Sequence, residues 1–107
     1  MNRIEIHLDL LRRIEKNPKY TQRALSKEMG ISLGKINYCV KKLIEKGWVK
    51  ANNFQSNPNK LNYTYLLTPK GIESKSKLTL SFLNLKIKEY ELLKSEITQL
   101  KIDSEKV

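Results

Sequence analysis

The C-terminal third of the chain contains nothing that would interrupt a helix. Residues 72–107 include neither Gly nor Pro. Just before them, Thr68 can cap a helix, and Pro69 suits its first position, where a missing N–H leaves no hydrogen bond unmade. We therefore expect one long helix over residues 69–107. The globular domain must then lie within residues 1–68, a length that can bury only one modest core.

The expected C-terminal helix carries an apolar stripe with the alternating three- and four-residue spacing of a coiled coil. Its seam consists of Leu83, Tyr90, Leu93, Ile97 and Leu100, and a second row, which widens the apolar face, consists of Leu78, Phe82, Leu85 and Leu92. Lys86 interrupts the seam at one core-type position. Because a lone helix would leave this face in water, we expect a homodimer. The part from Leu78 to Leu85 can also cover the chain's own domain, and the two arrangements are compatible.

Two shorter amphipathic helices are expected at the start of the chain. In the first, over residues 3–16, apolar residues recur every three or four positions until Asn17 and Pro18 end the helix. Thr21 can cap the second helix. Gly30 suits its C-terminal end, where a left-handed residue is common.

A third helix follows after a very short connection. Ser32 can cap it and Gly47 can end it, and its expected buried stripe consists of Leu33, Ile36, Val40, Leu43 and Ile44. Only Gly30-Ile31-Ser32 separates this helix from the preceding one. Two helices joined by so short a turn are typical of a helix-turn-helix motif.

Two short strands are expected next, over residues 48–51 and 61–67, where aromatic and other β-favouring residues gather. Residues 52–60 between them are rich in Asn, which is typical of a solvated loop. The strands therefore form a hairpin with a long polar tip. The predicted fold class is mainly α with a small β-hairpin (α+β): a winged helix-turn-helix over residues 1–68 and a long C-terminal dimerisation helix over residues 69–107.

The charge of the chain points to a polyanionic partner. It has 21 Lys and Arg against 11 Asp and Glu, a formal net charge of +10. Residues 1–70 hold fourteen of the basic and five of the acidic residues, whereas residues 71–107 hold seven and six. The excess thus belongs to the globular part, and binding to nucleic acid would release counterions from the phosphates. We expect double-stranded DNA as the partner.

The third helix is the expected recognition helix. With its apolar stripe turned inward, its N-terminal half presents Ser32, Lys35, Asn37 and Tyr38 to base edges in the major groove. Gly34 leaves room for close approach to the DNA. Lys41 and Lys42 are placed for phosphates. Any one of these lysines taken alone is equally well a solvated surface residue, so the prediction depends on the cluster.

Two further regions complete the expected DNA contacts. Thr21 and Gln22, at the exposed start of the second helix, can bind a phosphate through side-chain and backbone groups. Asn59 and Lys60, near the tip of the hairpin, can reach the DNA backbone or the minor groove. A two-fold dimer would bind a near-palindromic operator with half-sites about one helical turn apart.

The order of these elements, together with three sequence runs, resembles MarR-type winged-helix regulators. The runs are Leu43-Ile44-Glu45-Lys46-Gly47-Trp48-Val49, Leu67-Thr68-Pro69-Lys70-Gly71 and Ile31-Ser32-Leu33-Gly34-Lys35-Ile36-Asn37-Tyr38-Cys39-Val40-Lys41-Lys42-Leu43. The third run is similar to the branch associated with exopolysaccharide gene clusters. The resemblance implies a dimeric regulator of bacterial surface-polysaccharide genes that binds its operator through the helix carrying Lys35 and Asn37. The sequence leaves open whether the protein also binds a small-molecule effector.

Other kinds of function find little support in the sequence. His7 has no partner at a catalytic spacing, and Cys39 has none for a disulfide or a metal site. We therefore expect neither an enzyme nor a cofactor or metal. Cys39 is expected to be a packed small hydrophobe, with an oxidation sensor as the alternative. Without a membrane-spanning run or a signal sequence, a cytoplasmic location with no membrane partner is expected.

One alternative function remains beside DNA-binding regulation. Winged helices also serve as protein-interaction modules, and the C-terminal helix could recruit a different protein. In that case the DNA affinity would be weak, non-specific and strongly dependent on salt.

Overall fold

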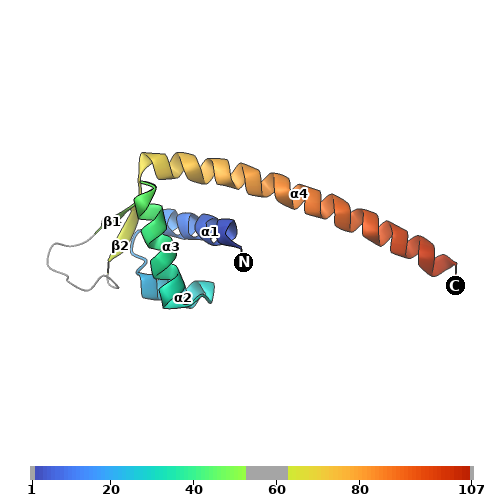
Figure 1. Cartoon of the computed structure of the whole chain (residues 1–107), viewed down its shortest axis with the longest axis horizontal. Coiled ribbons are helices and arrows are strands. Elements are labelled where there is room, and N and C mark those ends of the chain that lie inside the picture. The colour runs from blue at the N-terminus through green and yellow to red at the C-terminus, as the bar shows by residue number, and fades with distance from the viewer. Residues whose placement is uncertain (1, 53–62, 107) are drawn as a thin grey trace.

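The computed structural model describes residues 2–52 and 63–106 (Figure 1). Its elements, in chain order, are α1 (Arg3–Lys16), α2 (Gln22–Met29), α3 (Leu33–Glu45), β1 (Val49–Asn52), β2 (Thr64–Leu67) and α4 (Pro69–Glu105). The first five gather into one unit, and α4 leaves it as a single rod, so the molecule extends 71 × 26 × 20 Å. The expected class, mainly α with a small β-hairpin and a long C-terminal helix, is confirmed.

The helix boundaries are set by the capping residues that the sequence predicts. The side chains of Thr21, Ser32 and Thr68 each accept a hydrogen bond from the backbone N–H three residues later, at 3.0 to 3.2 Å. Gly30 ends α2 with a φ of 65°, a left-handed conformation that glycine adopts without a Cβ clash. The chain therefore turns from α2 into α3 within the predicted three residues.

One core joins α1, α2, α3 and the hairpin. Its most deeply buried side chains are Leu10, Leu11, Ile14, Leu25, Ile36, Val40, Leu43 and Val49, and Tyr65 lies beside them. The predicted inward stripe of α3 is confirmed at its centre but wrong at Ile44, which is 40% exposed. Ile44 lines a hollow between α3 and the hairpin, whereas Leu43 in the same turn of α3 is fully buried.

The two strands pair antiparallel, with Val49 opposite Leu67 and Ala51 opposite Tyr65. Because side chains alternate along a strand, these residues face the core, whereas Lys50 is exposed on the other face. β1 has the predicted length of four residues but lies one residue later than predicted, and β2 is shorter than predicted because it begins at residue 64. The predicted polar tip lies outside the described residues from residue 53 onward.

A tight joint connects α4 to the turn between α3 and β1. The N–H of Thr68 donates to the carbonyl of Trp48 at 3.0 Å, and the hydroxyl of Thr68 donates to the carbonyl of Gly47. Gly71 is buried against the same turn, and a Cβ atom at this position would lie 1.9 Å from the carbonyl oxygen of Trp48. Only glycine allows this approach, so Gly71 sets how closely α4 packs on the domain.

The joint predicts opposite effects for two glycine substitutions. Gly71→Ala should lower the free energy of unfolding by about 3 kcal/mol, because the new methyl group meets backbone that cannot move aside cheaply. Gly34→Ala is the control, since nothing lies within 4 Å of its Cβ position and alanine favours a helix by about 0.5 to 1 kcal/mol over glycine. Urea unfolding of both variants measures the difference. Equal stability of the two variants would contradict the proposed close approach.

The buried His7 predicts a loss of stability in acid. Burial lowers the pKa of His7 below the ordinary value of 6.5, and the charges of Lys46 and Arg3 lower it further. The unfolded chain then binds a proton more readily than the folded chain, so the free energy of unfolding should fall as the pH drops from 6.5 through the folded pKa. In urea unfolding between pH 5 and 8, His7→Leu should remove part of this slope. An unchanged slope would exclude His7 as its source.

Candidate nucleic-acid interface

The third helix buries one face and exposes the other. Ile36, Val40 and Leu43 lie in the core, and Cys39 is buried beside them. The exposed residues at the start of α3 and along its outward face include Ser32, Gly34, Lys35, Asn37, Tyr38 and Lys41. These six residues, which we call the recognition surface, all belong to the predicted DNA-binding set.

The basic side chains of α3 have different surroundings. Lys42 is half-buried, lies 3.4 Å from the carboxylate of Glu45, and places its Nζ 5.5 Å from the centre of the Tyr38 ring. Within residues 2–52 and 63–106, neither Lys35 nor Lys41 makes an ion pair. Since Lys42 would have to give up existing contacts, Lys35 and Lys41 are the more available of the three lysines for contact with DNA.

The start of α2 differs from the prediction. Gln22 was expected to be exposed, but it is only 3% exposed, so its placement on the DNA-binding surface is wrong. Its Nε2 donates to the Oδ1 of Asn37 at 3.1 Å and to the hydroxyl of Tyr65 at 3.0 Å. Thr21 is half-buried and caps the helix. Gln22 therefore connects the start of α2 to α3 and to β2.

Basic residues outside α3 complete the description of this surface. Arg23 on α2 and Lys50 on β1 are also exposed, and neither is among the predicted DNA contacts. In the sequence, only the charge of Arg23 and Lys50 could have suggested DNA contacts, because the orientation of these side chains depends on how α2 and the hairpin pack. The predicted contacts Asn59 and Lys60 lie outside the described residues.

The apolar face of α4 divides into two parts. Leu78 packs against the chain's own core, and Phe82 is half-buried beside Leu8 of α1. Both residues were predicted in the dimer interface, but in this structure they contribute to the domain. Lys86 lies 3.9 Å from the carboxylate of Glu5 on α1, which accounts for a lysine at a seam position.

The rest of this face projects beyond α1 into solvent (Figure 1). The exposed members of the predicted interface are Leu83, Leu85, Tyr90, Leu93, Ile97 and Leu100, which are 44 to 66% exposed. Further large apolar residues, among them Leu92 and Ile102, are also exposed here. An apolar strip of this length requires a partner in water.

Residues 5–50 match a protein-family model described as winged helix-turn-helix DNA-binding. This region runs from the first helix to the first strand, and the antiparallel partner β2 completes the hairpin. The fold is a winged helix-turn-helix. In the terms of this fold, α2 and α3 are the helix-turn-helix, and β1 and β2 form the wing.

Solved structures of MarR-type regulators share this winged-helix arrangement. MarR of Staphylococcus aureus, in complex with salicylate and kanamycin, is 26% identical over 75% of this chain and 52% of its own, with a TM-score of 0.63. BldR of Sulfolobus solfataricus is 19% identical over 91% of this chain and 73% of its own, with a TM-score of 0.68. FabT of Streptococcus pneumoniae, in complex with DNA, is 23% identical over 78% of this chain and 56% of its own, with a TM-score of 0.56.

The extent of these matches limits what they show. This chain spans 52% of the length of the Staphylococcus aureus MarR and 56% of the length of FabT. Only about half of each of these structures is therefore matched by this chain. No curated protein sequence matches the chain. The comparisons therefore show the fold, whereas the binding partner of the winged helix is inferred from the residues of this chain.

A hollow of about 300 Å³ lies between α3 and the wing. Its lining includes Gln22, Asn37, Lys41, Ile44 and Tyr63. Apolar groups from the strands form one wall, and polar groups of the helix-turn-helix form the other. This hollow explains why Ile44 and Lys41 remain accessible although the wing packs beside them.

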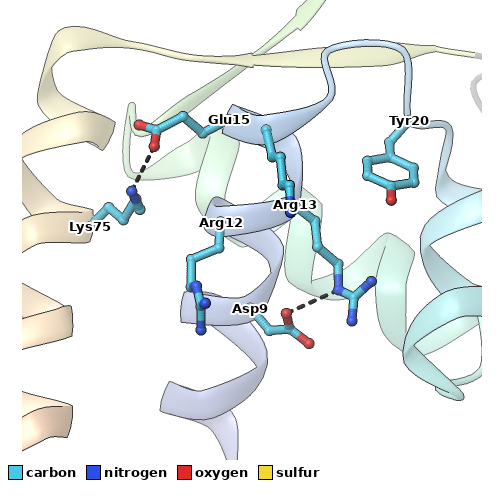
Figure 2. A pocket seen from close by; sticks show the side chains of 7 residues that line it. Asp9, Arg12, Arg13, Glu15, Tyr20 and Lys75 are labelled. Carbon is cyan, nitrogen blue, oxygen red and sulfur yellow. Dashed lines mark hydrogen bonds and ion pairs between the residues drawn. The ribbon is translucent and has the colours of Figure 1, made fainter.

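A second hollow, of about 670 Å³, lies between α1 and α4 (Figure 2). Arg13 is held there by Asp9 and Glu28, at 3.0 Å each, and Lys75 of α4 pairs with Glu15 at 2.6 Å. Much of the positive charge around this hollow is thus compensated within the chain. We assign no ligand to it.

Cys39 has the surroundings of a structural residue. It is 2% exposed, and burial raises the pKa of its thiol above the ordinary value, which disfavours the reactive thiolate. Among residues 2–52 and 63–106, no group of three or more His, Cys, Asp or Glu side chains is placed to hold a metal ion. No helix of this part of the chain is long and apolar enough to cross a membrane.

Proposed function

We propose that the chain is a MarR-like transcription regulator that binds duplex DNA as a homodimer. The observation that carries the proposal is the recognition surface of α3, which combines hydrogen-bonding side chains with two lysines that make no ion pair within residues 2–52 and 63–106. A cationic helix of this kind fits the major groove, where bases display their hydrogen-bonding groups. The likeness to FabT, solved with DNA, supports this assignment.

The roles of the recognition surface follow from its geometry. Ser32, Lys35, Asn37 and Tyr38, which are exposed, would read base edges, and Gly34 would let the helix approach the DNA closely. Lys41 and Thr21 would bind phosphates, and Lys42 would do so after leaving Glu45. Asn59 and Lys60 of the wing would add contacts to the backbone or the minor groove.

The exposed half of α4 is the proposed dimer interface. Two copies of this helix would cover each other's apolar strip, and a two-fold axis would present two recognition helices to a near-palindromic operator. From Tyr90 onward the strip lies beyond the residues of α4 that contact α1, so pairing of this part of α4 does not compete with the fold of the domain.

The target genes follow only from the resemblance of residues 31–43 to one branch of regulators. On that basis we assign the operator to a gene cluster for an exopolysaccharide. A genome search with an experimentally selected operator would test this assignment, and an operator upstream of unrelated genes would contradict it.

Removal of two lysines should weaken binding to all DNA sequences. A duplex enriched by the protein from a random pool supplies the ligand. Lys35→Ala combined with Lys41→Ala should lower the affinity at least tenfold and reduce the salt slope by about 2 per subunit, or about 4 for the dimer, because each subunit loses two cationic contacts with DNA. Lys77→Ala combined with Lys88→Ala is the control, since it removes the same charge from exposed positions of α4.

Fluorescence anisotropy at several salt concentrations measures both quantities. If the α3 variant and the α4 control lose affinity equally, only the net charge matters, and α3 is not the recognition helix. If no duplex is enriched and affinity merely collapses with salt, the winged helix is a protein-interaction module instead.

The dimer proposal predicts that charges in the apolar strip separate the subunits. Leu93→Glu combined with Leu100→Glu should convert a dimer into a monomer, because two carboxylates per chain would be buried in the interface. Ser81→Glu combined with Ser95→Glu adds the same charge to the side of α4 away from the seam and should leave the dimer intact. Analytical ultracentrifugation at micromolar concentration distinguishes the two. A monomeric wild-type protein would contradict the proposal.

A further inference from the structure

Gln22 connects the recognition surface to the interior of the domain. It is the first residue of α2 and is 3% exposed, whereas its partner Asn37 lies exposed on α3. Its Nε2 lies 3.1 Å from the Oδ1 of Asn37 and 3.0 Å from the hydroxyl of Tyr65, which is itself 3% exposed. The buried side-chain amide of Gln22 thus holds the exposed side-chain amide of Asn37 in place.

The direction of this hydrogen bond follows from the burial of Gln22. Its Nε2 uses both hydrogens, one for each partner, whereas its Oε1 is buried without a partner among the described residues. If the amide were reversed, the group without partners would be an NH₂ with two hydrogens, which is harder to bury than one carbonyl oxygen. The hydroxyl of Tyr65 accepts or donates equally well. Gln22 is therefore the donor, and Asn37 must offer its Oδ1.

This arrangement changes what Asn37 can present to DNA. A free asparagine reads adenine with both ends of its amide, accepting from N6 and donating to N7. Here the Oδ1 is turned toward the buried Nε2 of Gln22, so the Nδ2 with its two hydrogens is the end of the amide that is left for a ligand. Guanine matches such a donor, because its N7 and O6 are neighbouring acceptors in the major groove.

We propose that Gln22 is a positioning residue that makes Asn37 a donor-only reader, which selects guanine over adenine at the base pair that Asn37 contacts. This inference rests on the proposed function and adds to it the class of base edge that is recognised. Tyr65 orients Gln22 from β2, so the wing and the recognition helix are joined at the reading position.

The test compares operators that full-length variants select from a random duplex pool. Asn37→Ala locates the base pair, since the preference at one position of each half-site should disappear. Gln22→Glu replaces the donor by acceptors, and the N-terminus of α2 favours the new charge. Asn37 should then turn its Nδ2 inward and its Oδ1 toward the DNA. The expected result is a shift of about tenfold at that position, from guanine to adenine or cytosine, whose amino groups are donors.

Tyr65→Phe is the matched control. It removes the other hydrogen bond of Gln22 and leaves the bond to Asn37, so the variant should lose stability and keep the preference for guanine. If Gln22→Glu does not fold, Gln22→Met replaces it in the test, because the methionine side chain has a length similar to that of glutamine and no charge. With Asn37 released, both ends of its amide can pair with adenine, so the roughly tenfold preference for guanine should be lost.

The outcomes separate the two levels of the proposal. A folded Gln22→Glu or Gln22→Met protein that selects the same base at the same strength as the wild type would overturn the role of Gln22. Asn37→Ala with an unchanged operator would overturn it as well, and sequence-specific binding would still stand. If the wild-type protein enriches no sequence, the proposed function itself fails and the inference fails with it.

Discussion

The burial of Ile36, Val40 and Leu43 fixes how α3 is rotated about its own axis, and the rest of the surface depends on that rotation. With these side chains in the core, Lys35, Asn37 and Tyr38 must point outward. The bond from Gln22 to Asn37 adds a polar restraint at the same level of the helix. The core therefore defines the face of α3, and the buried amide defines how one residue of that face is held.

The fold separates the work of the chain into two regions with different physical demands. The domain needs a dry core and a basic exterior, and the charge of residues 1–70 provides the latter. The long helix needs only to be straight and apolar on one side. Gly71 and Thr68 join the two regions through contacts with the turn at Gly47 and Trp48, so α4 leaves the domain in a defined direction. In a dimer, that direction would set the distance between the two recognition helices.

Features that depend on neighbouring residues in the chain could be predicted from the sequence. The caps at Thr21, Ser32 and Thr68 and the left-handed Gly30 are local, and their positions are confirmed. Features that depend on distant contacts could not be predicted. Gln22 has the polarity of a surface residue at a helix start, and only Tyr65, far along the chain, accounts for its burial.

The same distinction applies to the apolar stripes. Ile44 fits the helical period of α3, but the period does not reveal where the core ends. Leu78 belongs to the second apolar row of α4, and it packs on the chain's own core, which is one of the two arrangements that the sequence allowed. A stripe predicts which side of a helix seeks burial, and the three-dimensional arrangement decides what buries each residue. The base that Asn37 is proposed to read could not be predicted from the sequence, because it depends on the direction of one hydrogen bond, from Gln22 to Asn37.

The most direct test of the account is to find where duplex DNA touches the protein. Amide chemical shifts of the isotope-labelled full-length chain would be recorded while an enriched duplex is added at physiological salt. The account predicts that the largest shifts fall on residues 32–42 and on the start of α2, whereas the exposed half of α4 changes little. Shifts concentrated on α4 or around the hollow between α1 and α4, with residues 32–42 unaffected, would contradict the assignment of α3 as the recognition helix.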